Sequence, residues 1–577
     1  MDYVAPVADI RFVLKSMAGL GDLITDGLAG ELDDNLLSAL LEEAGKAAQG
    51  LLAPLNIPGD RAGAKLTELG VTAAPGFTAA YEAWCQGGWS GVDASPEHGG
   101  MGLPTSVGAA IMEMWNAANM AFSLCPVLTQ GAAEAIAAHG SEDLKNLYLP
   151  RLIRGEWTAA MALTEPSAGS DLSQMRTRAE PVGDGTYRLL GNKIYITYGD
   201  HDMSPNIVHL VLARLSDAPA GTRGISLFLV PKFIPAANGN LGQRNDFRCT
   251  GLEHKLGIHA SPTCSISYGD SKGAIGWLIG RENEGLACMF TMMNRARLAT
   301  GLQGVGVGEH ATQRAYAYAR DRRQGRAGDD AMAPIIQHPD VQRMLLDMRS
   351  AVFAARAIAF SCGVAIDRAK RETDPARRAA AAAREALLTP MAKAFGADVG
   401  VETASLGVQV HGGMGYVEET GAAQHLRDAR IVPIYEGTNG IQAIDLVMRK
   451  VVKDGGVAAM ALIAEISEIS SAAEAPALTK AIEALTTTTA WLLQASEPER
   501  LAAAYPYLTL FSVTFGGGLL IKGALAAEAG AKDAPADIGV LANHFAAHRL
   551  SHASALADQA MHGARVLADP KAMAAYS

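Results

Sequence analysis

A glutamate beside a glycine is the residue in this sequence best suited to proton chemistry. Glu436 stands in the segment Ile431-Val-Pro-Ile-Tyr-Glu-Gly-Thr-Asn-Gly-Ile-Gln442, after an apolar run. A carboxylate in apolar surroundings acquires a raised pKa and becomes a stronger base. Thr438 or Asn439 would cap a helix that follows. Glu436 is therefore either a structural residue at a helix start or a general base.

Two other segments could contact a flat ligand. The first, Ala160-Met-Ala-Leu-Thr-Glu-Pro-Ser-Ala-Gly-Ser-Asp-Leu172, is a polar loop that offers hydroxyl and backbone N–H groups as donors. The second, Lys193-Ile-Tyr-Ile-Thr-Tyr-Gly-Asp200, has the alternation of a strand, which places Tyr195 and Thr197 on one face and Ile196 on the other. Taken alone, the first is equally a capping turn and the second an ordinary amphipathic strand.

Other common cofactor and catalytic motifs do not occur in the sequence. No Gly-x-Gly-x-x-Gly follows a strand, and Gly304-Val-Gly-Val-Gly308 has the wrong spacing and predicts close helix packing instead. Neither a Walker loop nor a Gly-x-Ser-x-Gly elbow is found. We expect no metal site, because no common zinc spacing is matched by His98, His201, His254, His259 or His425.

Composition favours a chain of several packed domains and argues against a nucleic-acid-binding protein. The 577 residues are 49% hydrophobic and 19% charged, with a net charge of −11. Binding to phosphate backbones requires basic stripes, which this balance does not favour. The six cysteines are scattered without a Cys-x-x-Cys pair, which indicates reduced, mostly buried thiols.

Neither a secretory signal nor a membrane span is expected. The first residues, Met1-Asp-Tyr-Val-Ala-Pro6, lack a basic region and an apolar region. The apolar stretch 507–521 is shorter than the roughly twenty residues that a spanning helix needs, and it contains three consecutive glycines. We interpret it as a buried helix of a bundle and expect a cytoplasmic enzyme.

The hydrophobic period changes twice along the chain. Strands are predicted at 187–197, 207–213, 224–231, 263–268 and 275–279, and their succession without helices predicts an antiparallel sheet or small barrel. Helical patterns cover about 51–158, then 294–322, 338–371, 377–410 and 426–452, and Asp33-Asp34 would cap a helix in the arm. We divide the chain into an N-terminal helical arm (1–50), a helical domain (51–158), a middle β-domain (159–282), a helical bundle (283–453) and an extra helical domain (454–577).

The three segments, in this order, resemble the acyl-CoA dehydrogenase family over about residues 50–450. LTEPSAGSDL is similar to the family's first motif, and RDARIVPIYEGTNGIQ is similar to its second, which contains the catalytic glutamate. The resemblance implies a mainly α fold with a central antiparallel, barrel-like β-domain and a four-helix bundle. The long ends resemble a bacterial subgroup that includes 3-methylthiopropionyl-CoA dehydrogenases and broad-range fatty acyl-CoA dehydrogenases, and they imply a homodimer.

The resemblance implies an FAD site at the junction of the middle and C-terminal domains. Tyr195 stands where the family usually has Trp, and Thr197 matches a flavin-contacting Thr. Arg322 matches an Arg that reaches the FAD pyrophosphate of a neighbouring subunit, a role that suits a bidentate guanidinium. The residues implied for FAD are Met161, Leu163, Thr164, Ser170, Tyr195, Thr197, Arg322, Gln409, Gly413 and Thr438.

The implied reaction is α,β-dehydrogenation of an acyl-CoA, with Glu436 removing the α-proton while hydride moves from the β-carbon to flavin N5. The residues implied for the substrate are Ser170, Asn294, Arg297 and Gly437. An electron-transfer flavoprotein is the expected acceptor. The expected substrate is 3-methylthiopropionyl-CoA, from dimethylsulfoniopropionate catabolism, or a short to medium fatty acyl-CoA. The alternatives are an acyl-CoA oxidase, which passes electrons to oxygen, and a non-catalytic acyl-CoA-binding protein.

Overall fold

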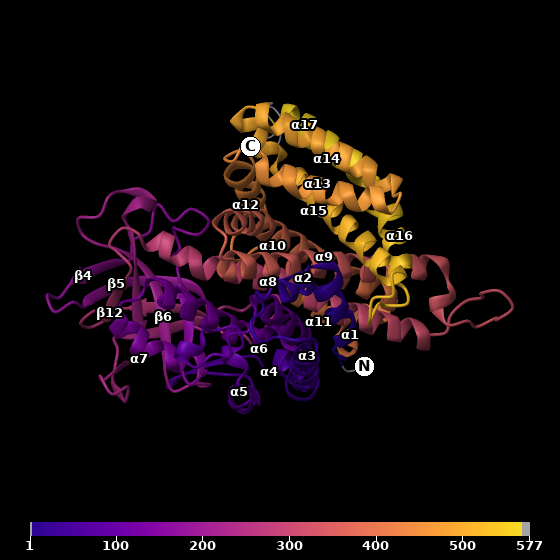
Figure 1. Cartoon of the computed structure of the whole chain (residues 1–577). Coiled ribbons are helices and arrows are strands. Elements are labelled where there is room, and N and C mark those ends of the chain that lie inside the picture. Colours follow the sequence, from indigo (N-terminus) through magenta and orange to yellow (C-terminus); the bar gives the residue numbers. More distant parts are fainter. Residues whose placement is uncertain (1–2, 568–577) are drawn as a thin grey trace. The chain divides into compact units, whose positions relative to one another are not determined.

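The computed structural model describes residues 3–567, which form two compact units (Figure 1). The first, called here the sheet unit, contains residues Ala47–Leu103 and Ala118–Ala296. The second, the bundle unit, contains the described parts of Met1–Lys46, Pro104–Ala117 and Arg297–Ser577. Two long helices contribute residues to both units, namely α6 (Thr105–His139) and α8 (Gly285–Asp321).

The sheet unit contains an eight-stranded sheet in the order β10-β11-β5-β12-β7-β6-β3, with β4 pairing with β5 and β6. Its pairs are antiparallel except that β3 and β4 each pair with β6 in parallel. The five predicted strands are confirmed as β5, β6, β7, β11 and β12. The strands of the sheet are β3 (Thr158–Ala162), β4 (Arg178–Pro181), β5 (Tyr187–Thr197), β6 (Ile207–Arg214), β7 (Ile225–Pro231), β10 (Phe247–Leu252), β11 (Thr263–Tyr268) and β12 (Ala274–Ile279).

One short hairpin contradicts the prediction that residues 51–158 are helical throughout. Strands β1 (Lys65–Thr67) and β2 (Gly70–Thr72) pair in antiparallel fashion, and Gly70 adopts a φ of +119° that other residues rarely reach. Such a small, largely exposed hairpin carries too little apolar periodicity to be recognised in a sequence. The helices α4 (Asn56–Ala62), α5 (Phe77–Gln86) and α7 (Glu142–Ile153) make up the rest of this region, and β8 (Phe233–Pro235) pairs with β9 (Leu241–Arg244) elsewhere in the unit.

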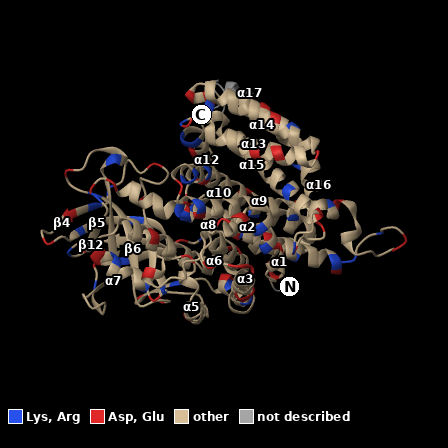
Figure 2. Ribbon diagram, in the orientation of Figure 1, with Lys and Arg blue, Asp and Glu red and all other residues tan. Residues whose placement is uncertain are grey.

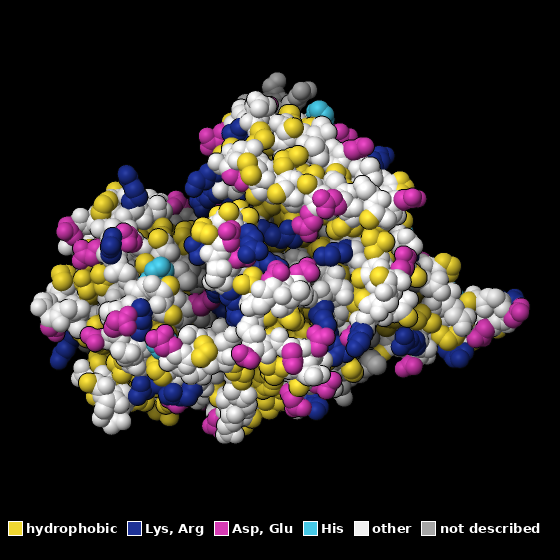
Figure 3. Space-filling view, viewed as in Figure 1, with side chains coloured by type: hydrophobic (Ala, Val, Ile, Leu, Met, Phe, Trp, Pro, Cys, Tyr) yellow, Lys and Arg dark blue, Asp and Glu magenta, His cyan; other side chains and the backbone are white. Residues whose placement is uncertain are grey.

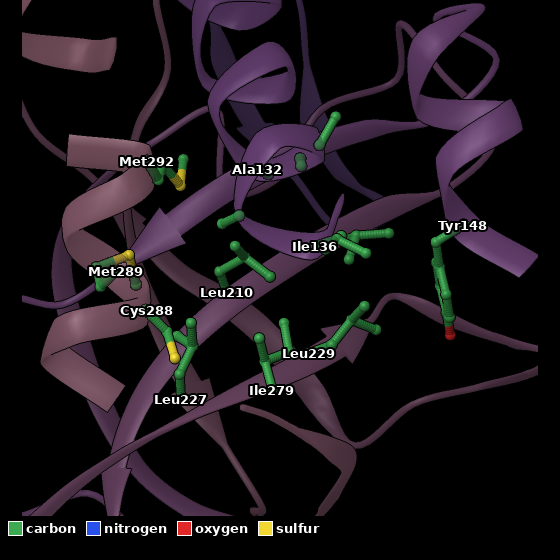
Figure 4. Close-up of a cluster of buried hydrophobic side chains, with 14 of the residues drawn as sticks. Ala132, Ile136, Tyr148, Leu210, Leu227, Leu229, Ile279, Cys288, Met289 and Met292 are labelled. Atoms are coloured by element: carbon green, nitrogen blue, oxygen red, sulfur yellow. The ribbon is translucent and has the colours of Figure 1, made fainter. Parts of the chain in front are cut away.

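A continuous apolar core joins the sheet to helices of the same unit. Leu227 and Leu229 of β7 lie with Ile279 of β12 in one buried cluster that also contains Ile136 of α6 and Met289 of α8 (Figure 4). Alternate residues of a strand face the same side, so every second residue of β7 contributes to this core. The core fixes the sheet on which the predicted ligand-binding strand β5 lies.

The bundle unit consists almost entirely of helices. Asp33 caps the predicted arm helix, because its Oδ1 accepts a hydrogen bond from Leu36 N at 2.7 Å. The helices are α1 (Val7–Phe12), α2 (Leu20–Thr25), α3 (Asp34–Ala47), α9 (Pro339–Arg371), α10 (Pro375–His411), α11 (Ala422–Ala429), α12 (Asn439–Ile444), α13 (Val457–Ala472), α14 (Pro476–Gln494), α15 (Glu497–Glu528), α16 (Ile538–His548) and α17 (Ala553–Leu567).

Glycines allow α8 and α10 to cross at very short distance. A Cβ on Gly304 would lie 2.0 Å from the carbonyl oxygen of Gly396, and a Cβ on Gly400 would lie 2.6 Å from the Cα of Gly304. The interpretation of Gly304–Gly308 as a helix-packing segment is therefore confirmed. The helical pattern over 426–452 is interrupted, because α11 ends at Ala429 and the intervening residues form the turn that holds Glu436, while α12 begins at Asn439 as the predicted cap at Thr438 or Asn439 requires.

Helices α13–α17 form an extension that packs on α9, α10 and α12 of the same unit. The apolar stretch 507–521 lies within α15, where added Cβ atoms would meet Ala354 at Gly516, Leu550 at Gly517 and Ile466 at Gly518, all within 3.1 Å. The glycines thus permit close helix packing, and the ribbons of α14 and α15 carry few charges (Figure 2).

Length does not distinguish this helix from a membrane span, since α15 has 32 residues. Among the described residues, α6, α9 and α15 are long and apolar enough to cross a membrane, and 83%, 94% and 67% of their most apolar windows is buried within the protein. Internal packing accounts for their composition. On the face shown in Figure 3, hydrophobic side chains lie among charges of both signs. All six cysteines are free and four are buried, which confirms the expectation for the thiols.

Three helices of the bundle unit meet at a buried ion cluster. Arg356 of α9 donates to Glu113 Oε1 at 2.6 Å and to Glu309 Oε2 at 2.8 Å, and its side chain is fully buried. Glu113 comes from α6 and Glu309 from α8. Removing one member of such a cluster leaves uncompensated buried charge, which is far more costly than losing a surface pair.

We expect Arg356→Ala to lower the free energy of unfolding by about 3–5 kcal/mol, because two carboxylates would lose their counter-charge. Chemical denaturation followed by circular dichroism measures this. Arg343→Ala is the matched control, since Arg343 lies on the same helix and pairs with Asp340 at the surface; it should cost at most about 1 kcal/mol. Equal losses of stability in the two variants would contradict the conclusion that Arg356 neutralises buried carboxylates.

Candidate active site

Glu436 lies in a strained turn, and a different residue caps the helix that follows. Its φ is +57° and that of Gly437 is +87°, so two successive residues are left-handed. This conformation is costly for a residue with a side chain and is concentrated at functional sites. Thr438 caps α12 by accepting a hydrogen bond from Ile441 N at 3.1 Å. The structural interpretation of Glu436 as a capping residue is therefore wrong.

The carboxylate of Glu436 is held without a hydrogen-bond donor. Its Oε2 is shielded from solvent and has no hydrogen-bond partner among the described residues. Burial raises the pKa of Glu436 to about 7, and the charges of Lys393 and Arg297 oppose that rise only in part. A carboxylate with this pKa is a stronger base than an ordinary glutamate and is still partly ionised near neutral pH, as a general base requires.

Two cations lie near this carboxylate. Lys393 of α10 is fully buried, and its Nζ donates to Val432 O at 3.0 Å and to Asn439 Oδ1 at 2.8 Å. Burial lowers the pKa of Lys393 to about 7, and Glu436 is the first charge that counters this shift. Arg297 of α8, predicted to lie near the CoA moiety, is buried in the bundle unit and pairs with Asp445 at 3.7 Å. Its predicted CoA contact remains a prediction.

Gln442 is the most informative residue that sequence reasoning missed. It is fully buried, and neither its Oε1 nor its Nε2 has a hydrogen-bond partner among the described protein residues. A Cβ on Gly437 would lie 2.6 Å from this Nε2, so glycine permits the amide to approach the turn. Buried amides are nearly always paired, which makes Gln442 a candidate ligand contact. Its only signal was its position at the end of the motif that holds Glu436.

The remaining predicted residues of the bundle unit lie at two neighbouring helix ends. Arg322 follows the end of α8 and Gln409 lies in the last turn of α10, and both are exposed. The rings of Tyr318 and His411 stack at 4.4 Å between these ends. Gly413 is also exposed, with nothing within 4 Å of an added Cβ. The arrangement leaves the guanidinium of Arg322 available to an anion.

In the sheet unit, a β-bulge aims Tyr195 outward. Cys264 pairs with Ile196 but Ile266 pairs with Lys193, so Ile194 and Tyr195 stand opposite a single residue of β11. Tyr195 has a φ of +60° and is 59% exposed, whereas Ile196 is 1% exposed. The predicted opposition of these two side chains is confirmed, and the bulge presents a free ring face.

The same bulge ties strand β5 to the predicted ligand-binding loop. Ile194 N donates to Thr164 O at 2.9 Å, so the loop after β3 is fixed beside Tyr195. Lys193 reinforces the junction, because its Nζ donates to Leu163 O at 2.9 Å and to Glu165 Oε1 at 2.8 Å. Glu165 also accepts bonds from Thr177. Lys193 and Glu165 stood inside the motifs but were not recognised as their supports.

The other predicted residues of the sheet unit differ in exposure. Met161 and Leu163 are partly buried and pack on the apolar core, whereas Ser170 and Asn294 are exposed. Thr164 and Thr197 are intermediate. The structure therefore places Thr164 and Tyr195 at the same junction between a loop and a strand. Met161 lies in β3 and Leu163 follows β3, so both lead into this junction.

The fold and these residues define a class of protein: a mainly helical chain with a central sheet unit and a shielded, unpaired glutamate oxygen in a strained turn. Family models match in chain order: acyl-CoA dehydrogenase N-terminal domain (68–156), middle domain (160–271), C-terminal domain (283–451) and acetyl-CoA dehydrogenase C-terminal-like domain (450–570). A 3-methylmercaptopropionyl-CoA dehydrogenase of Ruegeria pomeroyi is 46% identical over 544 residues, 92% of each chain.

Solved structures share the fold at lower identity. The Caenorhabditis elegans protein ACDH-11 in complex with C11-CoA aligns with a TM-score of 0.78 at 21% identity, covering 95% of this chain and 92% of that one. A Bacillus anthracis acyl-CoA dehydrogenase complexed with FAD aligns with a TM-score of 0.74 at 22% identity, covering 92% and 88%.

This chain belongs to the acyl-CoA dehydrogenase family, and it is an FAD-dependent oxidoreductase. Two local observations fit a flavin: the exposed Tyr195 ring at the bulge, and the buried amide of Gln442 without a protein partner. The predicted fold class is confirmed, including the central β-domain and the extra C-terminal helices.

The pH dependence of the protein's stability should include a contribution from Glu436. Because its pKa in the fold, about 7, exceeds its ordinary value of 4.5, the folded state loses stability as pH rises between these values. Glu436→Gln removes this loss, so the variant should gain in Tm over the wild type at about pH 8 and gain little at about pH 5. Differential scanning calorimetry at both pH values measures the two gaps.

Glu474→Gln is the matched control, since Glu474 is also left-handed, with a φ of +48°, but is exposed. The Tm difference between this variant and the wild type should be the same at both pH values. If the Tm difference between Glu436→Gln and the wild type does not increase with pH, the carboxylate is not held in a site that disfavours its charge.

Proposed function

We propose that the chain dehydrogenates a short acyl-CoA thioester between Cα and Cβ, with 3-methylthiopropionyl-CoA as the first candidate and Glu436 as the base. The observation that carries this proposal is a glutamate in a left-handed turn whose Oε2 is shielded and lacks a protein donor. A structural carboxylate would be paired, because an unpaired buried acid destabilises the fold. The absence of pairing is explained by a role that requires a reactive carboxylate.

The chemistry of the thioester defines what Glu436 must do. An α-proton of a thioester is weakly acidic, so a base with a pKa near the working pH removes it most effectively. Burial supplies that pKa, and the left-handed turn fixes the direction of the side chain. Bound FAD supplies the acceptor for the hydride that leaves the β-carbon. Lys393 and Arg297 supply positive charge near the carboxylate and limit how far its pKa rises.

The remaining roles follow from the residues' positions and from the family. Ser170, Asn294, Arg297 and Gly437 are proposed to contact the substrate. Arg322, Gln409 and Gly413 are proposed to contact FAD from a neighbouring subunit or its adenosine end, and their exposure supports this. A homodimer in the cytoplasm is the proposed state.

The substrate is proposed from the most extensive similarity. The Ruegeria pomeroyi relative aligns over 92% of each chain, so the match takes in most of the extension as well as the shared domains. That relative is named as a dehydrogenase of 3-methylmercaptopropionyl-CoA, another name for 3-methylthiopropionyl-CoA. A thioether sulfur occupies about the volume of a methylene, so a straight short chain of similar length is the natural competitor.

Glu436→Gln should retain FAD and acyl-CoA binding but lose flavin reduction. An amide cannot accept the α-proton, so the rate of anaerobic flavin bleaching by acyl-CoA should fall by at least about a hundredfold. Stopped-flow absorbance at the flavin bands measures this. Glu474→Gln should reduce FAD at the wild-type rate. Near-normal bleaching in Glu436→Gln would remove Glu436 as the base.

The substrate and the acceptor are tested in one series of steady-state assays. We expect 3-methylthiopropionyl-CoA to show a kcat/KM at least equal to that of any saturated acyl-CoA from propionyl to decanoyl. We also expect electrons to pass to an electron-transfer flavoprotein rather than to oxygen. A maximum at decanoyl-CoA would contradict the proposed substrate, and stoichiometric peroxide release would identify an oxidase instead.

A further inference from the structure

A line of hydrogen bonds runs from the C-terminal extension to the turn that holds Glu436. Tyr505 of α15 donates its hydroxyl proton to Asp398 Oδ2 at 2.6 Å. Asn439, the first residue of α12, donates from Nδ2 to Asp398 Oδ1 at 2.8 Å. Lys393 donates from Nζ to Asn439 Oδ1 at 2.8 Å. Each of the four side chains comes into contact with the next, and all belong to the bundle unit.

The last member of this line acts directly on the proposed base. Lys393 is the largest opposing charge on Glu436, and its second hydrogen bond, to Val432 O, holds the chain segment that leads into the turn. Lys393 has no exposure to solvent, so its charge depends on protein groups alone. Asp398 is one of those groups, because its negative charge favours the protonated lysine.

We propose that Tyr505 is a positioning residue through which the extension sets the pH range of the base: its hydroxyl keeps Asp398 ionised, and Asp398 with Asn439 keeps Lys393 charged and fixed beside Glu436. The proposal rests on the assignment of Glu436 as the base. It gives the extension a role in the reaction that the shorter chains of this fold, which lack α15, must fill in another way.

Other charged groups also act on Asp398 and Glu436, and the hydrogen-bonded line adds its own effect to theirs. Asp398 also lies near Glu402 on its own helix, which opposes its ionisation, and burial raises the pKa of Asp398 above its ordinary value. The donors Tyr505 and Asn439 counter that rise. Glu436 faces Lys393 from α10 and Arg297 from α8, and Arg297 in turn is near Asp445 and Arg449.

Tyr505→Phe deletes one donor without changing the ring. Asp398 then ionises less readily, Lys393 loses part of the negative charge that holds its proton, and Glu436 loses part of the positive charge that keeps it ionised. The acid limb of the rate of anaerobic flavin reduction should move upward by roughly half a pH unit, while the rate on the alkaline plateau stays near that of the wild type. Asp398→Asn should move the limb in the same direction and further.

Tyr507→Phe is the matched control on the same helix. Tyr507 is buried and bonds Thr489 at 2.9 Å, so both partners lie within the extension. This variant should lower the Tm without moving the acid limb. An acid limb that is unchanged in Tyr505→Phe would overturn the proposal, whether or not Asp398→Asn moves it. Failure of the proposed function is seen separately, as flavin reduction that survives in Glu436→Gln.

Discussion

A carboxylate with one oxygen shielded from solvent and left without a hydrogen-bond donor is the condition on which the rest of this site depends. Ionised groups are expensive to bury, and most proteins pair them. Here the cost is tolerated at Glu436 because the surroundings fix the turn independently. Thr438 caps α12, Asn439 bonds backbone and side chains of α10, and Lys393 holds the carbonyl of Val432. The glutamate is thus placed by its neighbours and contributes no bond from Oε2 of its own.

The sheet unit achieves a comparable result with a backbone irregularity. The bulge at Ile194 and Tyr195 frees an N–H group for Thr164 and turns the tyrosine ring away from the sheet. A regular strand would leave the loop after β3 without this anchor. The buried pair of Lys193 and Glu165 then joins the same two segments through side chains. Each unit therefore contains a left-handed residue supported by a buried lysine.

Much of this could be predicted from the sequence, and the exceptions have physical causes. Short runs of β-branched residues predict strands β5, β6 and β7, and the motif around Glu436 identifies that residue. The bulge could not be foreseen, because it is a register shift against β11, which lies about seventy residues further along the chain. Lys393 and Asp398 sit in a helix whose Ala-rich pattern indicates only packing. The start of α12 was predicted from the cap at Thr438 or Asn439, whereas the end of α11 at Ala429 was not, although Pro433 signalled a break.

The three successive glycines of α15 have a consequence for how the protein is built. Consecutive helix positions point about 100° apart, so Gly516, Gly517 and Gly518 face α9, the turn before α17 and α13 in succession. At this level the helix is enclosed on most of its circumference. A chain that stopped at residue 453 would uncover Ala354 and Ile358 of α9, which pack on the first of these glycines. The extension therefore covers part of the core of the bundle, and the extension and the bundle are expected to unfold as one cooperative unit.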